Sequence, residues 1–261
     1  MSYPKKSLGQ NFLVDQNIIK KIVNLANVKD KNILEIGPGR GALTDEIIKR
    51  SPKTLTIIEK DFFLAKKLKE KYGNNKKIKI LNHDILKFKI EKILVKKSTI
   101  FGNLPYNISS QILIKIIKLK NSFSRIDNII FMFQKELGNK IVCKFPSPHY
   151  GRLSILTNFK LNIVKKFLVS PNCFYPKPKV TSMVIHFRFK DKKISLIKEI
   201  NNLEKITSIF FSNKRKMVNK TIKKLFNYDI SSEIPELNTN QRPSELHPDL
   251  FYKITELFER K

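Results

Sequence analysis

The chain has 261 residues, with 52 lysines and arginines against 22 aspartates and glutamates, which gives a net charge of +30. A hydrophobic content of 41%, with 8 glycines and 12 prolines, indicates a globular protein with a sizeable core and excludes low-complexity and collagen-like classes. No apolar run reaches the ~18 residues that a membrane span needs, and the first residues lack the apolar stretch of a signal peptide, so we expect a cytoplasmic protein.

Five short β-branched segments alternate with charged or amphipathic helical stretches through the first half of the chain. The predicted strands are residues 32–36, 55–59, 78–81, 99–102 and 128–133. Strand–helix alternation at this spacing predicts an α/β fold with a parallel, doubly wound sheet. Residues 161–169 and 181–189 read as two closing strands on either side of a proline-rich loop.

Helical periodicity replaces the strand pattern after about residue 190. We therefore predict two domains, residues 1–190 and a small all-helical domain over residues 191–261. In the second, Val218, Ile222, Leu225 and Phe226 share one helical face, opposite a set of lysines. This pattern fits an ordinary surface helix and an RNA-facing helix equally well.

The positive charge indicates a polyanionic partner, because lysine and arginine side chains neutralise phosphates and release counterions. Most of the excess charge lies in the first 190 residues, so the polyanion is expected mainly against that domain. Most of the basic residues are lysines, and an AT-rich coding sequence would by itself produce such an excess of lysine. Lysine attracts phosphate but reads bases poorly, so the charge predicts nucleic acid without specifying a sequence.

The cysteines and histidines do not form a recognisable metal site. Cys143 and Cys173 are far apart, and the four histidines are scattered at positions 83, 149, 186 and 247. Metal sites use ligands at set spacings, so we expect neither a metal nor a disulfide framework.

The segment ILEIGPGRGALT (33–44) runs from a strand through Gly37, Gly39 and Gly41 into a helix. Glycines at such a turn let the backbone approach a nucleotide-like ligand without an interfering Cβ. The dinucleotide fingerprint GxGxxG is absent, and the preceding Glu35 suits enzymes that use S-adenosylmethionine better than dinucleotide enzymes.

Two carboxylates follow the next strands. Glu59 ends the second strand, where it is suited to accept both ribose hydroxyls of an adenosine; the plainer alternative is a solvated acid. Asp84 is predicted at the end of the third strand, within reach of an adenine amine.

The segment FGNLPYNIS (101–109) carries the most specific signal. Asn103-Leu104-Pro105-Tyr106 fits the [DNS]-[IVLP]-P-[YF] pattern of methyltransferases that act on exocyclic amino groups. The Asn103 oxygen and the backbone carbonyl of Leu104 or Pro105 can accept the two N–H bonds of such an amine. These bonds stabilise the positive charge that develops as the methyl group arrives. Tyr106 offers a ring for stacking on the flipped base.

With these four motifs in order, the chain closely resembles the bacterial small-subunit ribosomal RNA adenine dimethyltransferases, the kasugamycin-sensitivity methyltransferase family. Five further segments match that family: KSLGQNFLVD (6–15), MFQKE (132–136), YGRLS (150–154), FYPKPKV (174–180) and FFSNKRKMVNKTI (210–222). The resemblance implies a Rossmann-like class I S-adenosylmethionine-dependent methyltransferase domain with a small helical C-terminal domain. It also implies methylation of the N6 atoms of two adjacent adenosines in the 3′-terminal hairpin loop of 16S rRNA, within the (pre-)30S subunit, by a monomer.

The resemblance assigns roles residue by residue. The cofactor would contact Asn11, Leu13, Gly37, Gly39, Glu59, Asp84 and Asn103. The catalytic turn would be Asn103, Leu104, Pro105 and Tyr106. Phe174 would be a second stacking partner for the target base, with a buried loop anchor as the alternative.

Three other functions remain open. A 23S rRNA adenine dimethyltransferase of the macrolide-resistance type has the same motif order, although it usually carries isoleucine where this chain has Leu104. A non-catalytic rRNA-binding assembly factor is opposed by the intact motifs. A nicotinamide-dependent oxidoreductase is disfavoured, because a charge of +30 has no purpose there.

Overall fold

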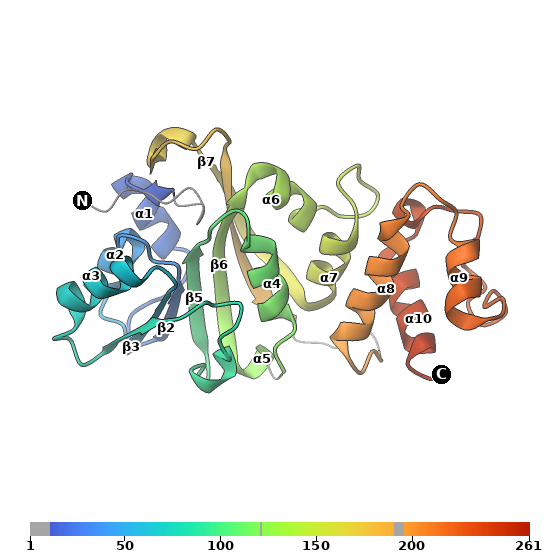
Figure 1. Ribbon diagram of the computed structural model, residues 1–261, viewed down its shortest axis with the longest axis horizontal. Helices are drawn as coiled ribbons and strands as arrows, with labels where there is room; N and C mark the ends of the chain where they lie inside the picture. Colours follow the sequence, from blue (N-terminus) through green and yellow to red (C-terminus); the bar gives the residue numbers. More distant parts are fainter. Residues whose placement is uncertain (1–10, 121, 191–195) are drawn as a thin grey trace. The chain divides into compact units, whose positions relative to one another are not determined.

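The computed structural model describes residues 11–120, 122–190 and 196–261 (Figure 1). By its internal contacts the chain divides into two compact units. The first comprises the described residues up to Gly138 together with Leu161–Phe189. The second comprises Asn139–Lys160 together with the described residues from Lys190 to Lys261. Among the described residues, no helix is both long enough and apolar enough to cross a membrane.

The first unit is built on a seven-stranded sheet in the order β4-β3-β2-β5-β6-β9-β7. Its strands are β2 (Asn32–Ile36), β3 (Thr54–Glu59), β4 (Ile78–Asn82), β5 (Ser98–Asn103), β6 (Ile126–Gln134), β7 (Leu161–Val169) and β9 (Ser182–Phe189). The strands from β4 to β6 run parallel, whereas β9 is antiparallel to both β6 and β7. The predicted α/β sheet is confirmed, and the two predicted closing strands form its antiparallel edge.

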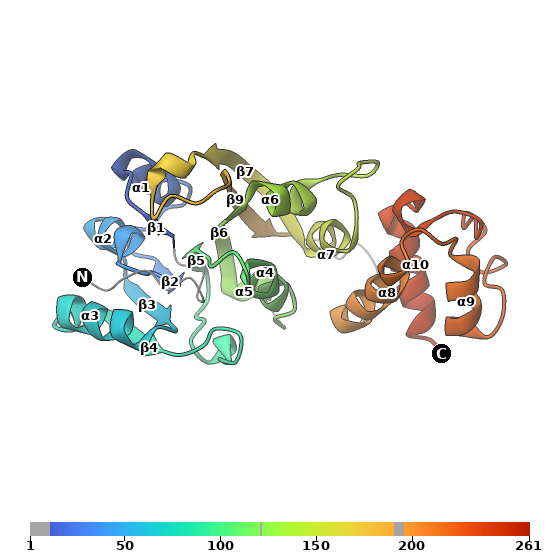
Figure 2. The same cartoon turned by 45° about the horizontal axis from the view of Figure 1, so that its top comes forward.

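Helices cover both faces of this sheet. They are α1 (Gln16–Val23), α2 (Ala42–Lys49), α3 (Phe62–Tyr72), α4 (Ser109–Ile117) and α5 (Ser122–Arg125). Figure 2 shows α1, α2 and α3 on one side of the sheet and α4 and α5 on the other. Two of the helices start at aspartate caps: Asp15 Oδ1 accepts the Ile18 N–H at 2.9 Å, and Asp61 Oδ1 accepts the Phe63 N–H at 2.9 Å.

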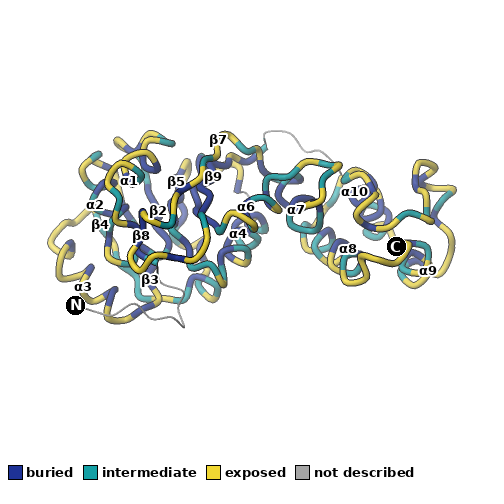
Figure 3. Tube along the Cα trace, turned by 90° about the horizontal axis from the view of Figure 1, so that it is seen from above, coloured by how far each residue is buried: buried dark blue, intermediate teal, exposed yellow. Residues whose placement is uncertain are grey.

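The apolar faces of α1, α2 and α3 meet the sheet in one core that includes Ile19, Ile47, Leu55, Ile57 and Phe101. In Figure 3 the central strands are buried along most of their length, while the outward faces of the helices are exposed. Each fully buried side chain of this kind contributes roughly 1.5–3 kcal/mol, so this core holds the parallel strands in register.

A separate two-stranded ribbon joins distant parts of the chain. Strand β1 (Phe12–Leu13) pairs antiparallel with β8 (Phe174–Tyr175), which places Phe12 opposite Tyr175 and Leu13 opposite Phe174. The Val14 N–H donates to the Cys173 carbonyl at 2.9 Å and continues the pairing. The start of the described chain is thereby fixed to the proline-rich loop between β7 and β9.

The second unit is helical. It contains α7 (Arg152–Lys160), α8 (Ile200–Ser212), α9 (Asn219–Phe226) and α10 (Pro248–Phe258), and α6 (Lys135–Val142) crosses the division between the units. The rings of Phe210 and Phe251 meet edge to face at 5.6 Å in its core. In α9 and its start, Val218, Ile222 and Phe226 are buried and the lysines opposite are exposed, while Leu225 is partly exposed.

This division differs from the predicted boundary for residues 139–160, which the sequence prediction placed in the first domain. They group with the tail because α7 packs against α8. The ring of Phe159 lies 5.0 Å from that of Tyr252, whose hydroxyl donates to the Ile155 carbonyl at 3.4 Å. A boundary based on where strand periodicity stops does not detect a helix that returns to a later unit.

Candidate active site

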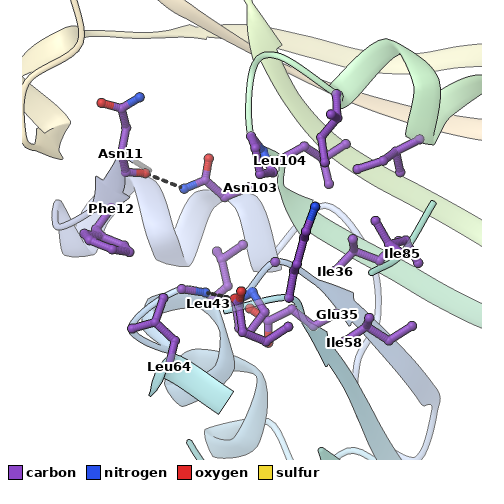
Figure 4. A pocket seen from close by; sticks show the side chains of 18 of the residues that line it. Asn11, Phe12, Glu35, Ile36, Leu43, Ile58, Leu64, Ile85, Asn103 and Leu104 are labelled. Atoms are coloured by element: carbon purple, nitrogen blue, oxygen red, sulfur yellow. Dashed lines mark hydrogen bonds between the residues drawn. The ribbon is translucent and has the colours of Figure 1, made fainter. Parts of the chain in front are cut away.

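A pocket lies at the point where the order of the parallel strands in the sheet changes direction. The chain passes from β2 outward to β3 and β4, then returns to the other side of β2 as β5. In open α/β sheets, ligands bind at the carboxyl ends of the strands beside this switch point. The cavity found there is lined by residues that follow β2, β3, β4 and β5, and by Asn11, Phe12 and Leu13 (Figure 4).

The glycine turn after β2 forms one wall of the pocket. Gly37 has φ +65° and donates its N–H to the Ile58 carbonyl at 2.9 Å, which fixes the turn to β3. Gly39 has φ +61°, and a Cβ there would lie 2.9 Å from the Phe12 ring. Gly39 is therefore required both by its left-handed backbone and by the ring that covers it.

Glu59 lies at the end of β3, 7% exposed, and lines the pocket. Its Oε2 accepts the Gly39 N–H at 3.2 Å, and its Oε1 accepts the Asp61 N–H at 2.8 Å. Burial raises the pKa of this carboxyl, and the two backbone N–H donors oppose that rise. The same carboxylate thus orients the glycine turn and lines the pocket.

Glu35, on β2, is the second carboxyl in the pocket and is 1% exposed. Its Oε2 accepts the Thr44 hydroxyl at 2.7 Å. Within the described part of the chain its Oε1 is buried without a hydrogen-bond partner. Burial raises its pKa to about 8, and Glu59 adds to that rise.

Asp84 also lines the pocket, two residues beyond the end of β4 rather than at its end as predicted. Its Oδ2 lies 3.0 Å from the Lys60 ammonium, and its Oδ1 accepts the Leu86 N–H at 2.9 Å. Burial by itself raises the pKa of Asp84, but the lysine and the Leu86 N–H outweigh it and lower the pKa. Asp84 is thus an ionised acceptor at the pocket wall.

The turn after β5 brings the predicted catalytic residues into the same pocket. Asn103 ends β5 and donates its Nδ2 to the Asn11 carbonyl at 3.1 Å. Figure 4 shows this bond, with the Asn103 side-chain oxygen directed away from Asn11. The Pro105 carbonyl already accepts the Ile108 N–H at 3.2 Å. Of the two backbone carbonyls predicted as acceptors for an amine beside the Asn103 oxygen, that of Leu104 is therefore favoured.

Tyr106 completes this turn and lines the pocket. Its hydroxyl lies 2.6 Å from Ser182 Oγ on β9. Burial raises the pKa of Tyr106, and the serine contact opposes that rise. The anchored hydroxyl restricts the orientation of the ring.

Phe174 does not line the pocket. Its ring is 4% exposed and packs in the core of the first unit, opposite Leu13 in the β1–β8 ribbon. This placement favours the buried loop anchor, since stacking would require the ring to leave the core. The stacking role stays a prediction.

The N-terminal residues assigned to the cofactor are both present at the site. Asn11 and Leu13 line the pocket, and Leu13 is buried at 3% exposure. Residues 6–10 of the same signature lie outside the described residues. Over the described ranges, no group of three or more metal-ligating side chains comes together, and Cys143 and Cys173 are unbridged.

Sequence reasoning missed two residues of the pocket that interact with predicted ones. Lys60 pairs with Asp84, and Arg40 places its guanidinium 4.6 Å from the centre of the Phe12 ring. Arg40 lies inside the glycine motif and Lys60 directly follows Glu59. A long basic side chain at either position has no sequence signature of its own in a chain this rich in lysine.

The strand order and the pocket together define a Rossmann-like methyltransferase followed by C-terminal helices. The chain belongs to the ribosomal RNA adenine dimethylase family, whose model matches residues 1–260.

Individual relatives agree with that assignment. The chain is 45% identical to the ribosomal RNA small subunit methyltransferase A of Pelagibacter ubique, over 98% of this chain and 97% of the relative. It is 37% identical to the protein of the same name from Mycoplasma mobile, over 96% and 98%.

Two solved structures share the fold. A dimethyladenosine transferase from Plasmodium falciparum aligns with a TM-score of 0.77 at 22% identity, covering 95% of this chain and 98% of that one. The 23S rRNA methyltransferase ErmE aligns with a TM-score of 0.69 at 23% identity, covering 95% and 100%.

Proposed function

We propose that the chain transfers methyl groups from S-adenosylmethionine to the N6 atoms of two adjacent adenosines in the 3′-terminal hairpin loop of 16S rRNA, giving N6,N6-dimethyladenosines during small-subunit biogenesis. The observation that carries this proposal is that the Asn103–Tyr106 turn opens into the same pocket as Glu59 and Asp84. One cavity thus has acceptors suited to the adenosine of a cofactor and, beside them, acceptors suited to an amine.

The residues present fit S-adenosylmethionine. The glycine turn leaves space at Gly37, where a Cβ would have only Pro105 and the Asn103 carbonyl at 3.7–3.8 Å. Glu59 would hold the ribose, and the ionised Asp84 would accept from the adenine amine. Glu35, whose buried Oε1 has no hydrogen-bond partner among the described residues, also lines this pocket and would suit a ligand that carries positive charge. The cofactor supplies an electrophilic methyl group.

The protein's part in the reaction is to hold the target amine. Asn103 Oδ1 and the Leu104 carbonyl would accept its two N–H bonds and direct the nitrogen lone pair toward the methyl group. As the nitrogen gains positive charge, both bonds strengthen, so they stabilise the transition state more than the bound substrate. The proton is lost after transfer, which is why the turn needs no histidine or cysteine.

The 16S target is supported by the 45% identity to the Pelagibacter small-subunit methyltransferase. The fold alone does not distinguish it from a 23S target, since the structure also aligns with ErmE. The deciding experiment incubates the protein and labelled S-adenosylmethionine with unmodified 30S subunits, naked 16S rRNA and 23S rRNA in parallel, then identifies the labelled nucleosides.

Dimethyladenosine formed only with small-subunit substrates is the expected result. Label in 23S rRNA would move the protein to the resistance-type activity. Tight binding to the subunit without label in any RNA would leave an assembly factor, and would refute the catalytic proposal.

Replacing Glu59 by alanine is expected to weaken binding of S-adenosylmethionine at least tenfold, because one charge-assisted hydrogen bond is worth about 1.4 kcal/mol or more. Isothermal titration calorimetry measures the dissociation constant directly. Glu70→Ala, an exposed acid on α3, removes the same charge without touching the pocket and should bind normally. Unchanged affinity in Glu59→Ala would rule out the ribose assignment.

A further inference from the structure

A stack of aromatic and cationic groups lies at the rim of the pocket, outside the assigned catalytic and cofactor positions. Phe12 covers Gly39, and the Arg40 guanidinium lies 4.6 Å from the centre of the Phe12 ring. The ring of Tyr175 also lies near this guanidinium, with its centre 6.0 Å away.

The β1–β8 pairing creates this stack. Phe12 and Tyr175 are opposite partners in the antiparallel ribbon, so their side chains project to the same face. The two rings differ sharply in exposure, because Phe12 is 7% exposed and Tyr175 is 60% exposed. Tyr175 therefore presents a large aromatic surface to solvent, held in place by the ribbon.

The position of these residues limits which ligand they can contact. Phe12 and Arg40 line the pocket that contains the Asn103–Tyr106 turn, whereas Tyr175 lies beyond its lining. A group that contacts Tyr175 and Arg40 is thus next to whatever enters the pocket. Aromatic rings and guanidinium planes are the surfaces on which proteins stack unpaired RNA bases, and arginine also pairs with phosphate. The net charge of +30 fits a polyanionic occupant.

We propose that Tyr175 and Arg40 form a platform for the nucleotide that adjoins the target adenosine, with the base stacked on the tyrosine ring and its phosphate near the guanidinium. This inference rests on the proposed function. In this arrangement the target base occupies the pocket, and the neighbouring nucleotide is held at the mouth of the pocket while the target base is methylated. Tyr175 is not among the residues that line the pocket, so we assign it a role in RNA binding and none toward the cofactor.

The test uses the full chain with unmodified small-subunit RNA. Tyr175→Ser should raise the KM for RNA at least about fivefold. This factor corresponds to the lower end of the free energy that stacking one base on an aromatic ring contributes. Tyr175→Phe, which keeps the ring, should restore the wild-type KM. The affinity for S-adenosylmethionine should stay unchanged in both variants.

A matched control is Phe123→Ser. Phe123 is similarly exposed, at 56%, but lies on α5 just before the amino end of β6, whereas the pocket lies at the carboxyl ends of the parallel strands. Its variant should leave the KM unchanged. A direct readout uses an RNA hairpin with 2-aminopurine beside the target adenosine, whose fluorescence should be quenched on binding by wild type and Tyr175→Phe but not by Tyr175→Ser.

The outcomes separate the two proposals. An unchanged KM and unchanged quenching in Tyr175→Ser, with wild type active, overturn the platform and leave the enzyme assignment intact. Equal KM increases in the Tyr175 and Phe123 serine variants would also overturn it, because the effect would then not depend on position. A wild-type protein that methylates no RNA would instead refute the proposed function.

Discussion

Alanine in place of Asn103 is expected to reduce methyl transfer by a factor of about 100–1,000 or more, the cost of removing one hydrogen-bond acceptor or donor that acts in a transition state. The side-chain oxygen is directed away from Asn11 because Nδ2 donates to the Asn11 carbonyl at 3.1 Å. Cofactor affinity should remain nearly intact, since Glu59 and Asp84 are unaffected. Single-turnover transfer measures the first quantity, and calorimetry with S-adenosylmethionine measures the second.

Asn103→Asp is the informative companion variant. It keeps an acceptor oxygen and fits the pattern of the motif, but it cannot donate to the Asn11 carbonyl. We expect partial activity, above that of Asn103→Ala. If Asn103→Ala loses cofactor binding and transfer to the same extent, the residue organises the cofactor site and the assigned catalytic role is wrong.

The part of this site that follows from sequence is the part built on parallel strands. β-Branched runs identify β2, β3, β4 and β5, and the carboxyl ends of parallel strands meet at one edge of the sheet. Residues that directly follow these strands must therefore lie close together. Gly37, Glu59, Asp84 and Asn103 all follow or end a strand, and all line one pocket.

The orientations of the side chains in β1 and β8 could not be predicted, because they depend on pairing between two short segments that are far apart in the sequence. Strands β1 and β8 have two residues each, too few for any periodic signal, yet their register decides where four aromatic and apolar side chains point. It buries Phe174 and exposes Tyr175, whereas sequence alone left the orientation of Phe174 open. Long-range register is a property of the assembled core, and local propensity does not contain it.

A buried polar network across β5, β6 and β9 predicts a loss of stability in acid. Asn128 Oδ1 lies 2.8 Å from His186 Nε2 and accepts from Arg188 Nε at 3.0 Å, while Asn128 Nδ2 donates to Thr99 at 3.3 Å. His186 is 3% exposed. Burial lowers its pKa from 6.5 to about 4, the Arg188 charge contributes to that shift, and Asp127 opposes it.

Because the folded-state pKa is depressed, the unfolded chain binds more protons between pH 6.5 and about 4. The free energy of unfolding should therefore be unaffected by this histidine above pH 6.5 and fall as pH drops through that window. The shift corresponds to a loss of about 3 kcal/mol when complete, at 1.36 kcal/mol per pKa unit.

Urea unfolding followed by far-UV circular dichroism, at intervals from pH 7.5 to 4.5, measures this loss; the chain has no tryptophan, so the usual fluorescence probe is absent. His186→Gln keeps a donor for Asn128 and does not titrate. Between pH 7.5 and 4.5, its free energy of unfolding should therefore decrease by about 2–3 kcal/mol less than that of wild type. The carboxylates are common to both proteins and cancel in the comparison. His149→Gln, at an exposed histidine, should follow wild type. Parallel pH profiles for wild type and His186→Gln would show that the buried imidazole is not the group that couples protonation to unfolding.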